Sequence, residues 1–321
     1  MPHAIRIHAT GGPEVLQWEG VDSVEPGANE VRLRHTAIGL NFIDVYERTG
    51  LYPLPLPTTL GREAAGVIDA VGTRVKQFAV GDRVAYLGTG TYTEYRVMPV
   101  ERLVRVPDAI DDRQAAAMML KGLTAQALLR QVHRVRRNEF VLIHAAAGGV
   151  GLIAVQWAKH LGAKVIAIVG SPAKAELVKK NGADHALLTQ NDWVAQVKSI
   201  TGGQGVHVVY DSVGKDTFIQ SLDSLRPRGM MVTFGNASGP VPPFAPLELS
   251  RRGSLFLTRP TLFHYIATAR ELQRAATELF GLVANGVIDI HVGQTFALAD
   301  AAAAHRALEA RATTGSTVLL P

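Results

Sequence analysis

Short apolar runs, many of them alternating with polar residues, fill the first 120 residues of the chain. The runs are AIRIH, EVRLRHTAI, AAGVIDAVG, DRVAYL and TEYRVMP, and Gly, Pro and Asp punctuate them. An alternation with a period of two is typical of half-buried β-strands, and the punctuating residues favour turns. The pattern predicts an irregular, mostly β domain in this part of the chain.

The pattern becomes helical from residue 111, and strand-like runs then alternate with amphipathic helical ones. The strand-like runs are FVLIHAA, AKVIAIV, HALLT, GVHVVYDSV, GMMVTFGN and SLFLTR; between them lie VGLIAVQWAKHLG, AKAELVKKNG, WVAQVKSITGG and DTFIQSLDSLRP. Parallel strands need long crossover connections, so this alternation predicts a parallel sheet with helices on both faces. The fold class is therefore α/β with a doubly wound second domain.

The chain returns to a helical pattern after about residue 262. A helix, ATARELQRAATELFGLVANG, is followed by a possible strand, VGQTFAL, and by a last helix that ends before STVLLP. We expect this tail to rejoin the first domain, so that the α/β domain is inserted between two halves. The predicted segments are 1–123 and 263–321 for the first domain and 124–262 for the inserted one.

Length and composition exclude several kinds of chemical site and indicate where the protein is located. At 321 residues the chain exceeds the usual single core, and it contains no cysteine, which excludes disulfides, thiolate zinc sites and cysteine nucleophiles. It has no apolar run of about 20 residues and no signal-like N-terminus, so we expect a cytoplasmic protein with no membrane partner. The formal charge of +5 suits anionic ligands. The one dense basic run, HRVRRN at 133–138, is interpreted as a solvated surface turn.

A glycine-rich stretch follows the run FVLIHAA. Counted from Ala146, the spacing through Gly148 and Gly151 is A-x-G-x-x-G, and an apolar helix comes next. Small residues let the backbone turn sharply and approach a pyrophosphate, while the helix N-terminus supplies N–H groups and positive potential. A glycine cluster alone could be a simple tight turn, but the order strand, glycines, helix predicts a dinucleotide site of the Rossmann type.

The end of the next strand indicates which dinucleotide is bound. NAD-specific sites usually place Asp or Glu there to hold the ribose 2′-OH, whereas this chain has Gly170 and Ser171, then Lys174. Without a carboxylate, a 2′-phosphate is not repelled, and Ser171 and Lys174 could donate hydrogen bonds to it. We therefore predict NADPH; the alternative is that Lys174 is only a solvated helix residue.

The order of these motifs resembles the medium-chain dehydrogenase/reductase superfamily, and specifically its zinc-free quinone oxidoreductases related to zeta-crystallin. The resemblance covers essentially the whole chain and rests on GLNFIDVYERTGLYP, LGREAAGVIDAVG, GDRVAY, KGLTAQ, HAAAGGVG, YDSVG, FGN, LTRP and RATTGS. It implies a Rossmann-type domain inserted in a mostly β, GroES-like catalytic domain. It also implies hydride transfer from NADPH to a small quinone.

The resemblance further implies that no metal takes part. Zinc alcohol dehydrogenases of the superfamily have a cysteine where this chain has Asn41 and a histidine where it has Arg62. A guanidinium is a poor ligand and no cysteine can complete the site. Glu63, which follows Arg62, is expected in structural polar contacts, and the protein would supply position, shielding from water and hydrogen bonds to the acceptor.

Individual residues acquire candidate roles from the same resemblance. The catalytic candidates are Asn41, Tyr46, Tyr52 and Thr124, although either tyrosine could be a packed aromatic and Thr124 a helix-start cap. His144 is interpreted as a hydrogen-bonded histidine near the core. Thr189 departs from the relatives, which carry a tyrosine there. The cofactor-binding candidates are Asn41, Phe42, Tyr46, Thr124, Gly148, Gly149, Val150, Gly151, Gly170, Ser171, Lys174, Ser212, Phe234, Gly235, Asn236 and Arg311.

Two other functions compete with quinone reduction. One keeps NADPH but reduces the C=C bond of an α,β-unsaturated ketone or aldehyde, and the sequence does not separate the two. The other is a non-catalytic role as an RNA-binding or crystallin-like structural protein, against which the sequence has no aromatic-stacking RNA motif. We expect no nucleic-acid partner, and we predict a homodimer that pairs through an edge strand near Leu255–Arg259.

Overall fold

The computed structural model describes all residues from 1 to 321, which fold into two compact units. Unit 1 comprises residues 1–121, 268–286 and 290–321, and unit 2 comprises 122–267 and 287–289. Unit 2 is thus inserted in the sequence of unit 1. The sequence places the breaks at 123/124 and 262/263, and the compact units break at 121/122 and 267/268.

A six-stranded parallel sheet forms the centre of unit 2. Its strands lie in the order β11-β10-β9-β12-β13-β14, and each neighbouring pair is parallel. Numbered along the chain, this is the 3-2-1-4-5-6 order of a doubly wound Rossmann sheet, as predicted. The strands are β9 (Phe140–Ile143), β10 (Lys164–Val169), β11 (His185–Leu188), β12 (Val206–Asp211), β13 (Leu225–Thr233) and β14 (Phe256–Thr258).

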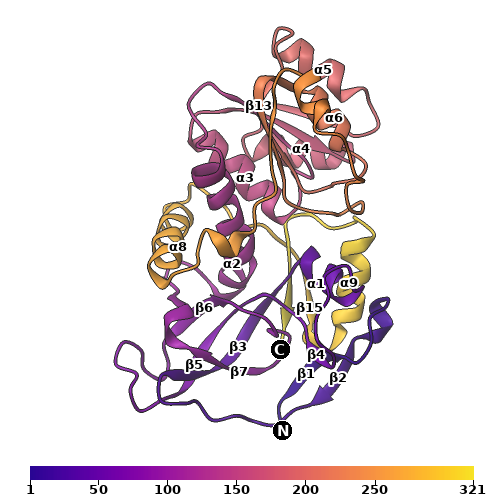
Figure 1. The fold of residues 1–321 in the computed structure, drawn as a ribbon. Helices are drawn as coiled ribbons and strands as arrows, with labels where there is room; N and C mark the ends of the chain where they lie inside the picture. The colour runs from indigo at the N-terminus through magenta and orange to yellow at the C-terminus, as the bar shows by residue number, and fades with distance from the viewer. The chain divides into compact units, whose positions relative to one another are not determined.

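Helices cover both faces of this sheet. Leu142, Ile166 and Ile168 on one face pack in a cluster with α5 (Trp193–Ile200) and α6 (Phe218–Asp223), which lie side by side in Figure 1. The helices α3 (Gly149–His160) and α4 (Pro172–Lys180) pack on β9, β10 and β11. A short helix, α7 (Leu247–Arg251), precedes β14.

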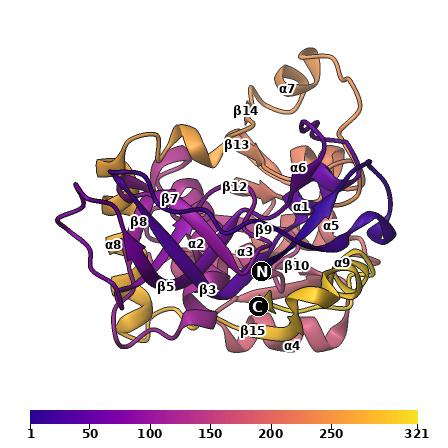
Figure 2. The ribbon, with the colours of Figure 1, turned by 90° about the horizontal axis from the view of Figure 1, so that it is seen from below.

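Unit 1 is a mostly β domain, again as predicted. Its larger sheet has the order β15-β16-β3-β5-β6-β8, with β7 also paired to β3, and a small sheet has the order β2-β1-β4. Figure 2 shows β3 and β5 of the larger sheet side by side. The strands are β1 (His3–Ile7), β2 (Gln17–Gly20), β3 (Glu30–Leu40), β4 (Thr58–Thr59), β5 (Glu63–Val71), β6 (Arg83–Leu87), β7 (Tyr95–Pro99), β8 (Leu103–Arg105), β15 (Val292–Ala297) and β16 (Ser316–Leu320).

The C-terminal tail belongs to unit 1. Strand β16 pairs with β3, and β15 pairs with β16, which brings the last residues of the chain beside the first long strand. The helices of this unit are α1 (Phe42–Arg48), α8 (Ala269–Ala284) and α9 (Ala301–Glu309). Helix α2 (Asp112–Gln126) contains the break between the units, and a single π-helical segment, Ala127–Val132, continues it. No helix of the chain has the length and apolar character needed to cross a membrane.

Candidate functional site

The strand order of unit 2 reverses between β9 and β12. Strands β10 and β11 continue from β9 in one direction, and β12, β13 and β14 continue in the other. In a doubly wound sheet, ligands bind outside the carboxyl ends of the strands at such a reversal. The glycine turn predicted from the sequence follows β9, and the segment Ser212–Gly214 follows β12, so both lie at the reversal.

The glycine turn closes at once after β9. The amide of Gly148 donates to the carbonyl of Ala145 at 2.9 Å, and the amide of Ala146 donates to Ile168 in β10 at 3.2 Å. Ala145 has a φ of 47°, a left-handed conformation that is costly for a residue with a Cβ. Gly148 is the N-cap of α3, which begins at Gly149.

The position of Gly151 tests whether the turn fits a pyrophosphate. A Cβ at this residue would lie 2.4 Å from the carbonyl oxygen of Ala145 and 2.6 Å from Cα of Ala146, so only glycine lets α3 start this close to the turn. The first amides of α3 have no partner within the helix, by helix geometry. A turn of alanine and glycine residues, ending in a helix N-terminus, fits an anionic phosphate group.

The end of β10 carries the groups predicted to select the cofactor. Ser171 is the N-cap of α4, and its hydroxyl oxygen accepts a hydrogen bond from the amide of Lys174. The hydroxyl proton is still available to a ligand. Lys174 is half-buried, and burial lowers the pKa of its ammonium group. A Cβ at Gly170 would meet no atom within 4 Å, so the segment has room for a ligand.

A buried carboxylate organises the end of β12, and the sequence did not single it out. Oδ1 of Asp211 accepts from the amides of Val213 and Gly214 at 2.8 and 3.1 Å. Its Oδ2 accepts from the hydroxyls of Thr217 at 2.7 Å and Ser221 at 3.0 Å. The available signal was an Asp at the end of a strand-like run, in the quoted motif YDSVG. Asp211 therefore holds the backbone that follows Ser212.

His144, at the end of β9, is part of the same network. Because the single hydroxyl proton of Ser221 goes to Asp211, the hydroxyl oxygen accepts from Nε2 of His144 at 2.9 Å. The imidazole is 1% exposed and its edge meets the ring of Trp193. Burial lowers its pKa, so it stays neutral. The interpretation of His144 as a hydrogen-bonded core histidine is confirmed.

The residues after β13 lie beside those after β12. Phe234 donates its amide to the carbonyl of Asp211 at 2.8 Å, and a Cβ at Gly235 would lie 2.4 Å from the carbonyl oxygen of Ser212. The guanidinium of Arg259 donates to the carbonyl of Gly235 and to the hydroxyl of Thr233, both at 3.0 Å. Asn236 is buried. Unit 2 thus brings together the predicted groups at the ends of β9, β10, β12 and β13.

In unit 1, Asn41 follows the end of β3 and is the N-cap of α1. Its Nδ2 donates to Oε1 of Glu63 at 2.9 Å and to the carbonyl of Gly39 at 3.3 Å. Glu63 is 0% exposed and also accepts from Nζ of Lys121 at 2.5 Å. The expectation that Glu63 makes structural polar contacts is confirmed. Lys121 was missed, although it opens the quoted motif KGLTAQ.

Helix α1 carries further buried charges. The carboxylate of Asp44 accepts from the amide of Asn41 at 2.8 Å and from the hydroxyl of Tyr92 at 2.9 Å, and burial raises its pKa to about 7. Arg62 forms an ion pair with Glu47, which is 2% exposed. The guanidinium at the position of the zinc enzymes' histidine is therefore committed to a carboxylate.

Three aromatic candidates lie in or after α1. The ring of Tyr46 lies 6.1 Å from that of Phe42 and meets the ring of Tyr52 edge-on at 5.3 Å. Tyr46 is 9% exposed, while Tyr52 and Phe42 are half-buried. Tyr46 is therefore a packed aromatic residue, as the alternative interpretation predicts.

Three other residues that the sequence singles out are Thr124, Thr189 and Arg311. Thr124 lies near the end of α2, so the expectation that it stands at a helix start is wrong: the helix begins at Asp112 and ends at Gln126, the last residue of the motif. Thr189 is exposed and donates its amide to Val169 at the end of β10. Arg311 is exposed, with a φ of 56°, just after α9.

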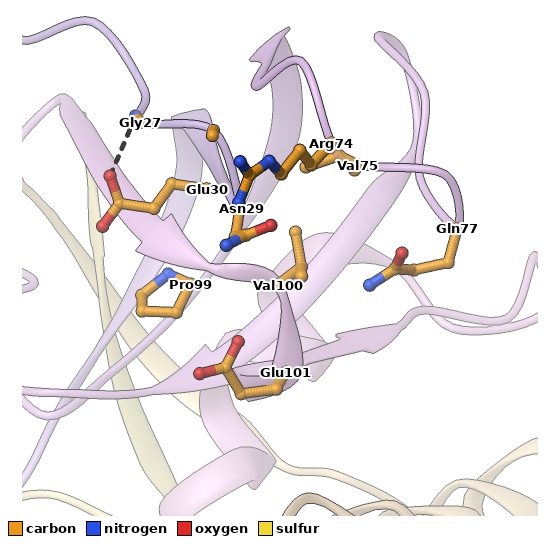
Figure 3. A pocket seen from close by; sticks show the side chains of 10 residues that line it. Gly27, Asn29, Glu30, Arg74, Val75, Gln77, Pro99, Val100 and Glu101 are labelled. Atoms are coloured by element: carbon orange, nitrogen blue, oxygen red, sulfur yellow. Dashed lines mark hydrogen bonds between the residues drawn. The ribbon is translucent and has the colours of Figure 1, made fainter.

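No group of three or more His, Cys, Asp or Glu side chains is arranged to hold a metal ion. A hollow of about 560 Å³ does exist in unit 1, and Figure 3 shows Arg74, Asn29 and Gln77 around it. It lies at Glu30, where β3 begins, whereas Asn41 follows the residue where β3 ends. The hollow is therefore not part of the Asn41 cluster.

Comparison with known proteins identifies the family. The family model described as "Alcohol dehydrogenase GroES-like domain" matches residues 27–108, and the one described as "Zinc-binding dehydrogenase" matches residues 149–281. A quinone oxidoreductase of Pseudomonas aeruginosa is 55% identical over 325 residues, with 100% of both chains covered. The chain belongs to the quinone oxidoreductases of the medium-chain dehydrogenase/reductase superfamily. The resemblance inferred from the motifs is confirmed.

Two further proteins that are similar to this chain bear on the chemistry of the family. The solved structure of Escherichia coli quinone oxidoreductase complexed with NADPH has a TM-score of 0.97 and 49% identity, and covers 99% of this chain and 100% of that one. A 2-haloacrylate reductase from a Burkholderia species is 48% identical, with 100% of this chain and 99% of that protein covered.

Proposed function

We propose that this protein is an NADPH-dependent quinone reductase that works without a metal ion. The observation that carries the proposal is the end of β10, where Ser171 and Lys174 stand in place of an acidic residue beside a glycine turn built for a pyrophosphate. The family relatives support the same reaction, since those at 49–55% identity are named quinone oxidoreductases.

Unit 2 would hold the adenosine half of the cofactor. Gly148, Gly149, Val150 and Gly151 would bind the pyrophosphate through backbone amides. Ser171 and Lys174, together with the Gly170 backbone, would donate hydrogen bonds to the 2′-phosphate. Thr124, Ser212, Phe234, Gly235 and Asn236 would border the nicotinamide half.

When bound, NADPH supplies the hydride that reduces the acceptor. Asn41 and Phe42 would position the ring and the substrate. The hydroxyl of Tyr46 or Tyr52 would orient the reduced oxygen and donate a proton to it. Arg62 is ion-paired with Glu47, and the chain has no cysteine. The polar side chains that would contact the acceptor are therefore those of Asn41, Tyr46 and Tyr52.

Titration with both pyridine nucleotides tests the cofactor assignment. We expect NADPH to bind more tightly than NADH, and the substitution Lys174→Ala to weaken NADPH about tenfold or more, since a hydrogen bond to a charged group contributes about 1.5–3 kcal/mol. Affinity for NADH should stay unchanged. The matched control is Lys179→Ala, in the last turn of the same helix. Equal affinity of the wild type for both nucleotides would overturn the assignment.

A second candidate reaction is the reduction of a conjugated C=C bond. The relative named 2-haloacrylate reductase favours it, since a haloacrylate is itself a conjugated acceptor. Oxidation of NADPH with a panel of quinones and a panel of α,β-unsaturated ketones, aldehydes and acids separates the two. Turnover confined to the unsaturated compounds would reject quinone reduction.

We also propose that the protein is a homodimer. Strand β14 is the last strand of the unit 2 sheet, so one of its sides has no neighbouring strand. The side chain of Phe256 in this strand is 57% exposed. An edge strand with an exposed aromatic residue is a natural surface for pairing with a second copy.

A further inference from the structure

We propose that Asn41 meets its ligand as a hydrogen-bond acceptor, and that the buried ion pair of Glu63 and Lys121 enforces this orientation of its amide. The inference rests on the proposed function, which places Asn41 against the cofactor or the substrate. Glu63 would then be a positioning residue, acting through Asn41 rather than by touching the ligand.

The orientation of the Asn41 amide follows from its neighbours. Nδ2 donates to Oε1 of Glu63 at 2.9 Å and to the carbonyl of Gly39 at 3.3 Å, which uses both of its hydrogens. An ionised carboxylate and a carbonyl are acceptors only. A turned amide would set Oδ1 against two oxygen atoms, and so the NH₂ group has to face these partners.

The amide oxygen of Asn41 is what remains for a ligand. It has two lone pairs. The capping box at the start of α1 directs at most one of them to the amide of Asp44. At least one lone pair is therefore available, and no N–H of the side chain is. Asn41 consequently does not act as a donor to an oxyanion in this arrangement.

Glu63 cannot turn to release the amide. Its Oε1 accepts from Asn41 and, at 2.5 Å, from Nζ of Lys121, while its Oε2 accepts from the amide of Leu120 at 2.6 Å. The Glu63 side chain is 0% exposed and that of Lys121 is 7% exposed, so neither charge is screened by water. Gly39 permits the close approach, because a Cβ there would lie within 2.5 Å of Oε1 of Glu63.

The ligand group that matches this acceptor is an N–H or O–H donor. The proposed reaction offers two sources of such a donor: the carboxamide of the nicotinamide ring and the hydroxyl of the hydroquinone product. Both carry the chemistry that Asn41 is set to recognise.

The substitution Glu63→Gln should loosen the hold on the amide of Asn41. A glutamine has one oxygen and one NH₂ group, and the ammonium of Lys121, which is a donor only, needs the oxygen. The NH₂ group then meets the amide of Leu120, which is also a donor, so the side chain is no longer fixed at both of its ends. The neutral oxygen is also a weaker acceptor for Nδ2 of Asn41 than the carboxylate is.

Binding measurements with matched ligand pairs test the proposal. One pair is NADPH and its reduced 3-acetylpyridine analogue, which lacks the carboxamide N–H; the other is hydroquinone and its dimethyl ether, which lacks the O–H. We expect the wild type to prefer the donor-bearing member of one pair by about fivefold to tenfold, as the loss of one hydrogen bond predicts. The pair that discriminates identifies the source. Glu63→Gln should reduce the preference.

Controls separate orientation from general damage. Glu47→Gln also neutralises a buried, ion-paired carboxylate in unit 1 and should leave the preference intact. Asn41→Leu should abolish it, and adding Glu63→Gln should then change nothing, as expected of coupled residues. If Glu63→Gln does not fold, the comparison of the wild type with Asn41→Leu still decides whether the amide oxygen of Asn41 accepts a hydrogen bond from the ligand.

The possible failures point to different conclusions. A wild type that binds neither NADPH nor its analogue defeats the proposed function. A wild type that binds NADPH and reduces quinones, but shows no preference within either pair, defeats only the acceptor role of Asn41. A preference that is as large in folded Glu63→Gln protein as in the wild type defeats the positioning role of Glu63.

Discussion

At the scale of residues, unit 1 buries a hydrogen-bonded chain between α1 and α9. Arg48 donates to Nδ1 of His305 at 3.0 Å, Nε2 of His305 lies 3.2 Å from the hydroxyl of Tyr92, and that hydroxyl donates to Asp44 at 2.9 Å. Since the guanidinium is a donor only, Nδ1 must carry a lone pair and the imidazole must be neutral. Burial and the charge of Arg48 lower the pKa of His305 to about 3.

The neutral state of His305 makes the fold sensitive to acid. The pKa of His305 rises from about 3 in the folded chain to its ordinary 6.5 on unfolding, so below pH 6.5 the unfolded chain binds an extra proton. The stability from this group is complete above pH 6.5 and is lost as pH falls toward 3, by about 1.4 kcal/mol per pH unit. We expect His305→Gln to flatten the decrease, measured by urea unfolding between pH 7 and 4.5.

Asp44 acts in the opposite direction and gives the check on sign. Its folded pKa of about 7 lies above its ordinary 3.8, so its contribution is present at low pH and is lost as pH rises through 7. Asp44→Asn should therefore steepen the acid decrease that His305→Gln flattens. An exposed histidine, His264, changed to Gln is the control. Equal acid sensitivity of the wild type and His305→Gln would contradict this account.

At the scale of elements, Asp211 joins the end of β12 to α6 and, through Ser221 and His144, to the end of β9. These are the two strands at the reversal of the sheet, where the cofactor is proposed to bind. The network holds the backbone after β12 through the amides of Val213 and Gly214, and it holds the side chain of His144 at the end of β9. These hydrogen bonds of Asp211 therefore determine the geometry of the turn that contains Ser212.

We expect Asp211→Asn to weaken both the fold and cofactor binding. An asparagine must turn an NH₂ group toward two of the four donors, and hydrogen bonds to a charged group contribute about 1.5–3 kcal/mol each. Urea unfolding should show a loss of at least that size, and the affinity for NADPH should fall. Asp223→Asn, at the partly exposed end of α6, is the control and should cost under about 1 kcal/mol. Unchanged NADPH affinity in a destabilised Asp211→Asn protein would limit the network to stability.

The sequence predicts the elements of unit 2 well because their signals are local. Apolar strands, glycine turns and amphipathic helices repeat there, and the order of the motifs is enough to place Gly148, Gly151 and Ser171. Glu63 and Lys121 are 58 residues apart, and no local pattern indicates that they meet. Thr124 was expected at a helix start, whereas α2 begins at Asp112 and continues through Gly122 to Gln126. The contact between Glu63 and Lys121 depends on tertiary packing, which a local sequence pattern does not record.

At the scale of the whole molecule, the tail decides how the chain is divided. The last strand, β16, pairs with β3, which lies more than 270 residues earlier in the sequence. The sequence predicts a helix, a strand and a last helix after residue 262, but nothing in STVLLP indicates which strand it pairs with. Unit 1 thus depends on both ends of the chain, while unit 2 is continuous apart from residues 287–289.

The proposed homodimer gives the last prediction. If β14 pairs with a second copy, a charge at Phe256 would be buried in the interface without a partner, which disfavours association. We expect sedimentation velocity at micromolar concentration to show a dimer for the wild type and a monomer for Phe256→Asp. Val80→Asp is the matched control, because Val80 is also exposed and lies in unit 1. A monomeric wild type would refute the pairing, and equal dissociation of the two variants would show that the interface lies elsewhere.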